Sequence, residues 1–230
     1  MKPGLYLVST PIGNMEDITL RAIGILKEVD IIASEDTRRS GLLLKKYNIK
    51  KPLLSYYDHN KLERTPEIIK RIKEGESFAL VSDAGTPGIS DPGFYLVREA
   101  IKEGIPVIPI PGPTALISGL VVSGLPTDRF AFEGFLPRRK GRRRKRLQQL
   151  VDEERTMVFF EAPHRLLYFL QDLQEILGDR HIAVSRELTK KFEDIERGNV
   201  SDFLDTYKQK KPKGEFVIVV EGSKSYANKD

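Results

Sequence analysis

Residues 82–93 (SDAGTPGISDPG) form the stretch of this chain best suited to bind a small molecule. The stretch follows an apolar run and precedes an amphipathic segment. Glycines there let backbone amides approach a ligand closely, and the Asp83 carboxylate can accept a hydrogen bond from an amine or a hydroxyl. A tight loop of ordinary turn residues is the alternative, because a short motif gains meaning only from its structural context.

Three other apolar runs end in equally polar or turn-forming sequence: 9–14 (STPIGN), 34–39 (SEDTRR) and 109–115 (PIPGPTA). Each run has the length and composition of a buried strand. The carboxyl ends of parallel strands lie at one edge of a sheet, where open α/β folds bind ligands. We therefore expect the four loops to converge on one preformed pocket with apolar walls and a few polar groups.

The sequence lacks the signatures of several enzyme classes. It has no cysteine, which excludes a thiol nucleophile, a disulfide framework and a Cys-ligated zinc. His59, His164 and His181 show no metal-ligand spacing, so no metal site is expected. The glycine fingerprint of dinucleotide enzymes, a Walker loop and a serine nucleophile elbow are also missing from the sequence.

Residues 138–146 (RRKGRRRKR) concentrate positive charge in a chain whose net charge is only +5. Such a block repels itself unless a polyanion or an acidic protein surface lies nearby. Nucleic acid is the favoured partner, because each cation that neutralises a phosphate releases a counterion. A solvated helix face is the alternative.

Composition indicates a soluble, cytoplasmic protein. A chain of 230 residues with 40% hydrophobic content can bury a substantial core. The first apolar run, at 5–8, is too short for a signal-peptide core. No run reaches the roughly 20 apolar residues of a membrane-spanning helix.

The first half of the chain alternates strands with helices. Strands are predicted at 5–9, 30–34, 53–56, 78–82 and 106–110. Between them, the residues after Asp17 have helical spacing, Thr65-Pro66 and Gly75 bracket a second helix, and Asp91-Pro92 and Gly104 bracket a third. This order predicts βαβ units, hence an α/β fold with a mainly parallel sheet covered on both faces.

Turn-forming residues at 123–128 (SGLPTD) interrupt the pattern and place a domain boundary there. We predict an N-terminal α/β domain at 1–124, a mixed α/β domain at 128–222 and a flexible tail at 223–230. The second domain has predicted strands at 130–135, 157–160, 182–186 and 216–220, with 192–197 a weaker hairpin partner of 182–186. Leucines at helical spacing predict a helix that ends at Gly178, and Ser201 is a candidate cap for another.

Several of these motifs resemble the tetrapyrrole methylase superfamily: the proline-containing first loop, the Gly-Pro loop after the fourth strand and PGPTA after the fifth. Within it, the sequence is similar to the ribosomal RNA small subunit methyltransferase I branch. The motifs that carry this resemblance run from residue 9 to residue 220, nearly the whole chain: STPIGN, SEDTR, SDAGTPGISDPG, SGLPTDRF, EGFLP, EAPHR, RELTKKFE and GEFVIVV.

The resemblance implies a homodimeric enzyme that binds S-adenosyl-L-methionine between two α/β domains and methylates the 2′-hydroxyl of a cytidine in 16S rRNA. The implied cofactor residues are Pro11, Asp83, Ala84, Gly85, Thr86, Ile89, Thr114, Ala115, Phe160 and Glu161. The implied RNA contacts are the basic run, namely Arg138, Arg139, Lys140, Arg142, Arg143, Arg144, Lys145 and Arg146, joined by Arg38 and Arg39.

A ribose hydroxyl is a poor nucleophile, so a carboxylate that takes its proton would help. Glu35 and Asp36 are ranked first because they follow a strand that ends at the presumed site; Asp58, His59, Glu161 and Glu187 are further candidates. For each, an ion pair with a nearby arginine or a helix cap is the alternative, and Arg38 and Arg39 could equally neutralise the acidic pair.

Aromatic residues offer stacking surfaces for an unpaired base, with core packing as the alternative. The candidates are Tyr56, Tyr57, Phe132 and Phe135. Two other functions stay open: methylation of a porphyrin-like ring, which the basic run argues against, and a non-catalytic role in ribosome assembly.

Overall fold

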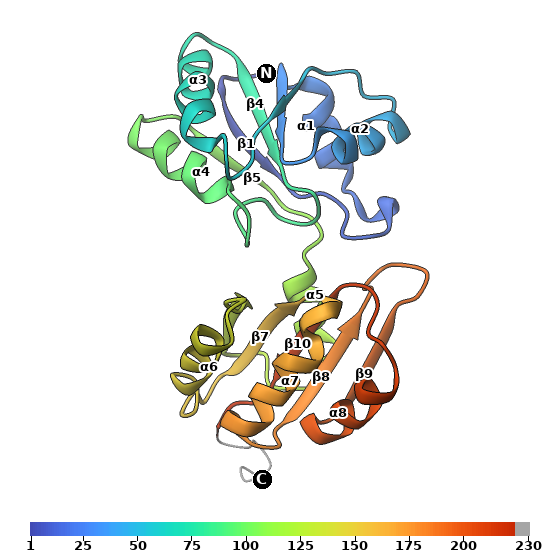
Figure 1. The fold of residues 1–230 in the computed structure, drawn as a ribbon. Coiled ribbons are helices and arrows are strands. Elements are labelled where there is room, and N and C mark those ends of the chain that lie inside the picture. Colours follow the sequence, from blue (N-terminus) through green and yellow to red (C-terminus); the bar gives the residue numbers. More distant parts are fainter. Residues whose placement is uncertain (224–230) are drawn as a thin grey trace. The chain divides into compact units, whose positions relative to one another are not determined.

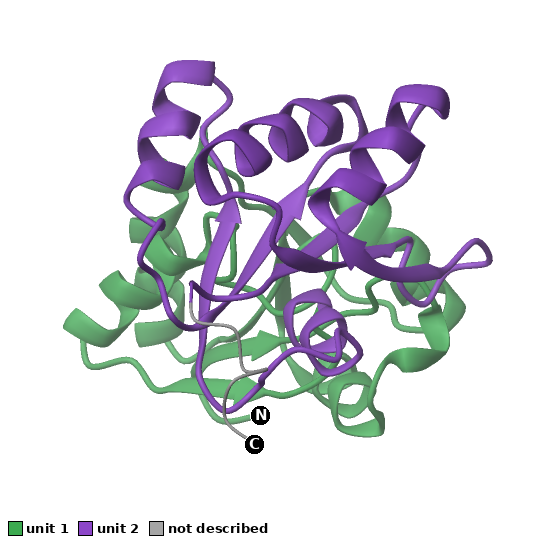
Figure 2. Ribbon diagram, turned by 90° about the horizontal axis from the view of Figure 1, so that it is seen from below, with its two compact units in different colours: residues 1–114 green, residues 115–230 purple. Residues whose placement is uncertain are grey.

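The computed structural model describes residues 1–223 and divides the chain into two compact units, Met1–Thr114 and Ala115–Asp230 (Figures 1 and 2). The division precedes the turn sequence at 123–128, where the boundary was predicted. Helix α5 (Ala115–Val121) therefore belongs to the second unit. Apart from Ser223, the predicted tail lies outside the described residues.

The first unit is built on a wholly parallel sheet of five strands in the order β3-β2-β4-β1-β5. The strands are β1 (Gly4–Val8), β2 (Ile31–Ser34), β3 (Leu53–Ser55), β4 (Ser77–Val81) and β5 (Val107–Ile110). The predicted α/β class and all five predicted strands are confirmed. Their nearly continuous apolar sequence reflects burial on both faces of the sheet.

Helices cover the two faces in pairs. Helices α1 (Leu20–Glu28) and α2 (Thr37–Lys46) pack on one face, and α3 (Lys61–Lys73) and α4 (Gly93–Lys102) pack on the other. A short 3₁₀ helix, η1 (Met15–Asp17), precedes α1. The chain therefore leaves β1 toward one face and leaves the neighbouring strand β4 toward the opposite face. Such divergence opens a ligand-binding crevice at the carboxyl edge of parallel sheets.

The predicted start of α3 at Thr65-Pro66 is wrong, because the helix begins at Lys61 and Pro66 lies inside it. Asn60 organises this earlier start: its side chain accepts a hydrogen bond from the Tyr57 amide at 2.8 Å and donates to the Ser55 carbonyl at 3.0 Å. Thr65 is buried, and its hydroxyl lies 3.1 Å from the Tyr56 hydroxyl. The predicted end at Gly75 and the predicted bounds of α4 are confirmed.

The second unit contains a mixed sheet in the order β6-β7-β10-β8-β9. Its strands are β6 (Phe130–Phe135), β7 (Thr156–Glu161), β8 (His181–Arg186), β9 (Asp194–Asn199) and β10 (Phe216–Val220). Strands β6 and β7 run parallel, and the other pairings are antiparallel. The weaker prediction, a hairpin of β8 with the segment after it, is confirmed.

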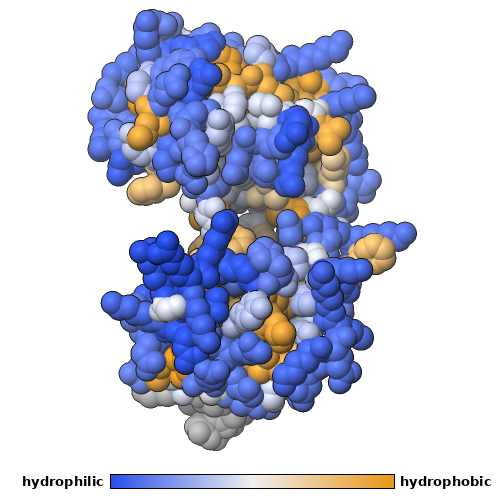
Figure 3. All heavy atoms as spheres, viewed as in Figure 1, coloured by the Kyte–Doolittle hydropathy of each residue, from blue (hydrophilic) through white to orange (hydrophobic). Residues whose placement is uncertain are grey.

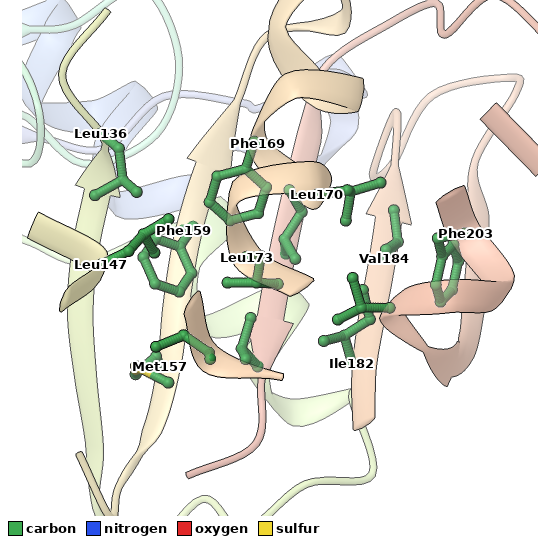
Figure 4. Packing of buried hydrophobic residues seen from close by; sticks show 14 of the residues in the cluster. Leu136, Leu147, Met157, Phe159, Phe169, Leu170, Leu173, Ile182, Val184 and Phe203 are labelled. Atoms are coloured by element: carbon green, nitrogen blue, oxygen red, sulfur yellow. The ribbon is translucent and has the colours of Figure 1, made fainter. Parts of the chain in front are cut away.

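Helices α6 (Lys140–Gln148), α7 (Pro163–Leu177) and α8 (Val200–Gln209) pack on one face of this sheet around a core that includes Phe159, Phe169 and Leu173 (Figure 4). Helix α7 ends at Gly178 as predicted. The cap of α8 is Asn199, paired with Asp202 in a capping box, so the prediction of Ser201 as cap is wrong. No helix in the described part of the chain is long and apolar enough to cross a membrane.

Candidate functional site

The loops after β1 and β4 are joined backbone to backbone at the carboxyl edge of the first sheet. The Thr10 amide donates to the Gly85 carbonyl at 2.9 Å, and the Gly85 amide donates to the Thr10 carbonyl at 3.0 Å. The Thr10 hydroxyl also donates to the Ser82 carbonyl at 3.2 Å. This two-way contact lies where the chain leaves β1 and β4 in opposite directions.

The loop after β5 joins the same group. The hydroxyls of Ser9 and Thr86 lie 2.9 Å apart, and the Thr86 hydroxyl donates to the Pro113 carbonyl at 3.4 Å. A side chain at Gly85 would start 3.4 Å from Ile12 and 4.0 Å from the Thr114 Cα. Residues of the three loops therefore share one small volume, as predicted from the strand ends.

Gly85 occupies a backbone conformation that glycine favours. Its φ is +82°, in the left-handed region that residues with a Cβ rarely adopt. Gly88 and Ser90 in the same loop also have positive φ, +90° and +63°. Local strain of this kind concentrates at ligand-binding sites, where the surrounding structure must hold it in place.

Asp91 holds this strained loop. Its carboxylate accepts from the Gly88 amide at 2.9 Å and from the Gly93 amide at 2.7 Å. Burial raises the pKa of Asp91, although both amides act in the opposite direction. In the sequence, Asp91 stood out only as a helix-start signal. The spacing of an aspartate two residues before a glycine that opens the helix was the available clue.

Asp83 connects the loop after β2 to this group. It accepts from the Asp36 amide at 3.0 Å, and its other oxygen lies 3.4 Å from the Arg39 guanidinium. All four predicted loops thus meet at one edge. Among the remaining candidates, Pro11 and Thr114 are half-buried, while Ala84 and Ile89 are exposed. Ser9 and Ile12 belong to the same group, although nothing in their shared motif singled them out.

Glu35 and Asp36 differ sharply. Asp36 caps α2 by accepting from the Arg38 amide at 2.9 Å, and its carboxylate also binds the Arg38 side chain at 3.0 Å. These bonds lower the pKa of Asp36, which makes it a poor proton acceptor. The Glu35 carboxylate has no such partner within residues 1–223. Partial burial and the charges of Asp83, Asp91 and Asp58 raise the pKa of Glu35.

The other acid candidates are engaged in ion pairs. Asp58 binds Lys61 at 2.8 Å, Glu187 binds Lys190 at 2.9 Å, and Glu161 lies 3.1 Å from Arg165. Arg38 and Arg39 are paired with Asp36 and Asp83, so they neutralise the acidic pair and its neighbour.

In the second unit, Glu161 is buried at the end of β7, and burial raises its pKa. Its Oε1 accepts from the Ala162 amide at 2.8 Å, whereas Oε2 is buried without a hydrogen-bond partner in the described structure. Phe160 is half-buried and contacts the rings of Phe132 and Phe135 at centroid distances of 5.0 and 5.6 Å. Ala115 begins α5 and is also half-buried.

The aromatic candidates divide between core and surface. Tyr56 is fully buried, so it packs in the core. Tyr57 is partly exposed beside His59. Phe132 is half-buried, whereas Phe135 is exposed, which leaves Phe135 available as a stacking surface.

The basic run contains two kinds of residue. Arg143 is buried, and its guanidinium binds Asp172 at 2.6 Å with side-chain exposures of 7% and 3%. Arg144 binds Asp172 and Glu175, and Arg146 binds Glu133 at 2.8 Å. Arg143 is therefore not a surface residue, contrary to its place among the expected RNA contacts. No sequence signal pointed to Asp172 as its partner.

The other five cations of the run have exposed side chains without an ion-pair or hydrogen-bond partner among the described residues: Arg138, Arg139, Lys140, Arg142 and Lys145. Figure 3 shows the dense hydrophilic surface that gathers over α6. Three arginines in ion pairs thus fix the helix, and five cations remain free to meet a polyanion.

Comparison with known proteins agrees with this geometry. Residues 4–204 match the family Tetrapyrrole (Corrin/Porphyrin) Methylases. Ribosomal RNA small subunit methyltransferase I of Thermotoga maritima is 53% identical over 218 residues, which cover 95% of this chain and 98% of that protein. The protein of the same name from Synechocystis is 52% identical over 220 residues, 95% of this chain and 79% of that protein.

A solved structure shares the fold. Uroporphyrin-III C-methyl transferase from Thermus thermophilus, complexed with S-adenyl homocysteine, superposes with a TM-score of 0.65 at 20% identity, covering 94% of this chain and 96% of that one. The family match over most of the sequence and the identity above one half show that the chain belongs to the tetrapyrrole methylase family and, within it, to the ribosomal RNA small subunit methyltransferase I family.

Proposed function

We propose that this chain transfers a methyl group from S-adenosyl-L-methionine to the ribose 2′-hydroxyl of a cytidine in 16S rRNA. The observation that carries the proposal is the convergence of four loops at one sheet edge, around a glycine whose backbone conformation disfavours a side chain. Relatives with half of their residues identical carry the name of an enzyme that acts on small-subunit rRNA.

The first unit fits a nucleoside-like cofactor. Gly85 lets the backbones of the first and fourth loops meet without a side chain between them, and the Ser9 and Thr86 hydroxyls are already fixed by partners. We assign Pro11, Asp83, Ala84, Gly85, Thr86, Ile89 and Thr114 to cofactor binding. The assignment of Ala115, Phe160 and Glu161 to the same cofactor stays a prediction. When bound, the cofactor supplies a methyl group already activated by a sulfonium centre.

Orientation is then the main task of the protein. When the ribose hydroxyl is held in line with the methyl group, the bimolecular reaction becomes effectively unimolecular, which raises its rate. The hydroxyl proton passes to a carboxylate as the new carbon–oxygen bond forms. Glu35 suits this role because it is free of ion pairs and has a raised pKa, which brings it closer to the pH at which a base works best.

RNA binding falls to the five free cations of the basic run. Arg144 and Arg146 have partners in the protein and contribute less, and Arg143 contributes through the position of α6. Homodimer formation and a cytoplasmic location are further parts of the proposal, and both rest on the resemblance to the family.

Purified 30S subunits, incubated with the protein and labelled S-adenosyl-L-methionine, test the function directly. We expect label in 16S rRNA at a 2′-O-methylated cytidine, found by mapping alkali-resistant positions. Label confined to protein or to small molecules would refute the RNA assignment. Methyl transfer to a tetrapyrrole in place of RNA would indicate the porphyrin-like substrate, and no binding at millimolar cofactor would indicate a non-catalytic factor.

A further inference from the structure

The connection between β8 and β9, residues 187–193, holds a large apolar ring in solvent. Phe192 is 64% exposed, and the Lys191 ammonium lies 5.6 Å from the centroid of its ring. Figure 1 shows this connection projecting beyond the strands that it joins. An exposed phenylalanine beside a cation needs an explanation, because burial would stabilise the ring.

The turn that carries Phe192 is rigidly built. Glu187 and Thr189 both have positive φ, +52° and +66°, although neither is glycine. The Glu187 carboxylate accepts from the Glu215 amide and from the Lys190 ammonium, each at 2.9 Å. Lys190 also binds the Glu215 carboxylate at 2.8 Å, and the Thr189 amide donates to Glu193 at 2.5 Å. Strained backbone held by several bonds is typical of a preorganised binding loop.

A second basic segment lies against this turn. Gly214 contacts Glu187 so closely that a side chain at that glycine would collide with it, and the Glu187 amide donates to the Glu215 carbonyl. Residues 210–213 (KKPK) lead directly into this contact. Four lysine side chains here are exposed and have no ion-pair or hydrogen-bond partner in the described structure: those of Lys191, Lys210, Lys211 and Lys213. We call residues 187–193 and 210–213 the hairpin surface.

Strand register places the hairpin surface at the same sheet edge as the start of the basic run. Phe135 at the end of β6 pairs with Phe160, Glu161 at the end of β7 pairs with Phe216, and Phe216 pairs with Arg186. Strands β6 and β9 are the two outer strands, so the two ends of this edge lie roughly 19 Å apart, four strand spacings. Each end carries an exposed phenylalanine close in sequence to free cations, Phe135 near Arg138 and Phe192 beside Lys191.

We propose that the hairpin surface binds an unpaired nucleotide of the RNA substrate. Phe192 stacks on the base, and Lys191, Lys210, Lys211 and Lys213 contact the flanking phosphates. This inference rests on the proposed function and extends its RNA surface beyond the basic run. Aromatic rings flanked by cations are the usual means of binding single strands, since every base has a face to stack on. A second copy of the chain is disfavoured, because pairing this surface with itself would bring four free cations against four others.

Binding of a short labelled single-stranded RNA to the full-length protein tests the proposal, with the same strand annealed to its complement as comparison. Phe192→Ala should lower affinity for the single strand about tenfold to a hundredfold, the range expected for loss of one stacked base. Affinity for the duplex should change little, and Phe192→Trp should restore binding to the single strand. Lys191→Gln should reduce the slope of log affinity against log salt by about 0.7.

Phe94→Ala is the matched control, because Phe94 is also 64% exposed and lies under a cation, with Arg98 5.9 Å from its ring centroid. It should leave RNA affinity unchanged. The proposal is overturned if Phe192→Ala binds the single strand with unchanged affinity, or if the wild-type protein does not bind unpaired RNA. A changed oligomeric state with unchanged RNA affinity overturns it in favour of a self-contact. Loss of methyl transfer with intact RNA binding would instead count against the proposed function alone.

Discussion

The two units stabilise the carboxyl-end loops of their parallel strands by different interactions. In the first unit, neutral groups join the loops: the Thr10 and Gly85 backbones, the Ser9 and Thr86 hydroxyls and the Pro113 carbonyl. In the second, ion pairs hold the loop after β8, whose carboxyl end lies at the same edge as those of β6 and β7: Lys190 binds Glu187 and Glu215. A small cofactor needs closely packed loops with a few polar groups, whereas RNA needs cations, and this difference agrees with the roles proposed for the two units.

The proposed function assigns the chemistry to the first unit and RNA binding to the second. Glu35→Gln tests the first assignment most severely. If Glu35 accepts the hydroxyl proton, kcat should fall about a hundredfold to ten-thousandfold. RNA affinity, measured by filter binding, should not change. Glu28→Gln is the control, because Glu28 is an exposed acid of the same unit, at the end of α1.

The same residue predicts a pH dependence. A base must be deprotonated, so kcat falls as pH is lowered through the pKa of Glu35. Because that pKa is raised, the fall should begin at a higher pH than for an ordinary glutamate. Single-turnover rates against pH measure it, and an unchanged acid limb in Glu35→Gln would remove Glu35 from the mechanism.

The next largest effect is expected from breaking the buried ion pair of the second unit. Asp172→Ala leaves the Arg143 guanidinium buried without its partner, which should lower the free energy of unfolding by about 3–5 kcal/mol. Glu175→Ala removes only the exposed partner of Arg144 and should cost less than about 1 kcal/mol. Urea unfolding measures both. Equal losses in the two variants would show that α6 is not held by its buried pair.

Gly85→Val probes the backbone meeting point of the first unit. Its positive φ and its nearness to Ile12 should together cost about 1–3 kcal/mol in the binding-competent conformation, or roughly tenfold to a hundredfold in cofactor affinity. Gly104→Val is the matched control, since Gly104 has φ +70° with open space around it. Both variants strain the backbone, but only Gly85→Val also crowds the loops. The difference between their affinities for S-adenosyl-L-methionine, measured by calorimetry, therefore reports the crowding at Gly85.

The smallest effect is expected from the free cations. The triple change Arg138→Gln, Arg139→Gln and Arg142→Gln should reduce the salt slope of RNA binding by about 2, at about 0.7 for each phosphate that is no longer neutralised. Cofactor affinity should stay the same. Arg146→Gln, which removes a cation already bound to Glu133, should change the slope less. A parallel loss of cofactor affinity in the triple variant would contradict the separation of roles.

The sequence by itself determined the strands of this protein and the position of the loop cluster. Strand runs such as 5–9 and 78–82 are almost entirely apolar because the sheet is buried on both faces, and parallel order then brings their loops to one edge. The helix ends at Gly75, Gly104 and Gly178 could also be predicted from the sequence, because each glycine takes a positive φ at a helix terminus.

Tertiary structure alone decided which charges are free. The sequence of the basic run does not distinguish Arg143 from Arg142. They differ because α6 directs Arg143 toward Asp172 on α7, 29 residues away in the chain. Likewise Asp36 and Glu35 are adjacent acids, yet only Asp36 caps α2 and binds Arg38. The turn that carries Phe192 is held by contacts of Glu215 with Glu187 and Lys190, which no local pattern reveals. Ion pairs between distant residues form only once the chain has folded, so these roles follow from packing.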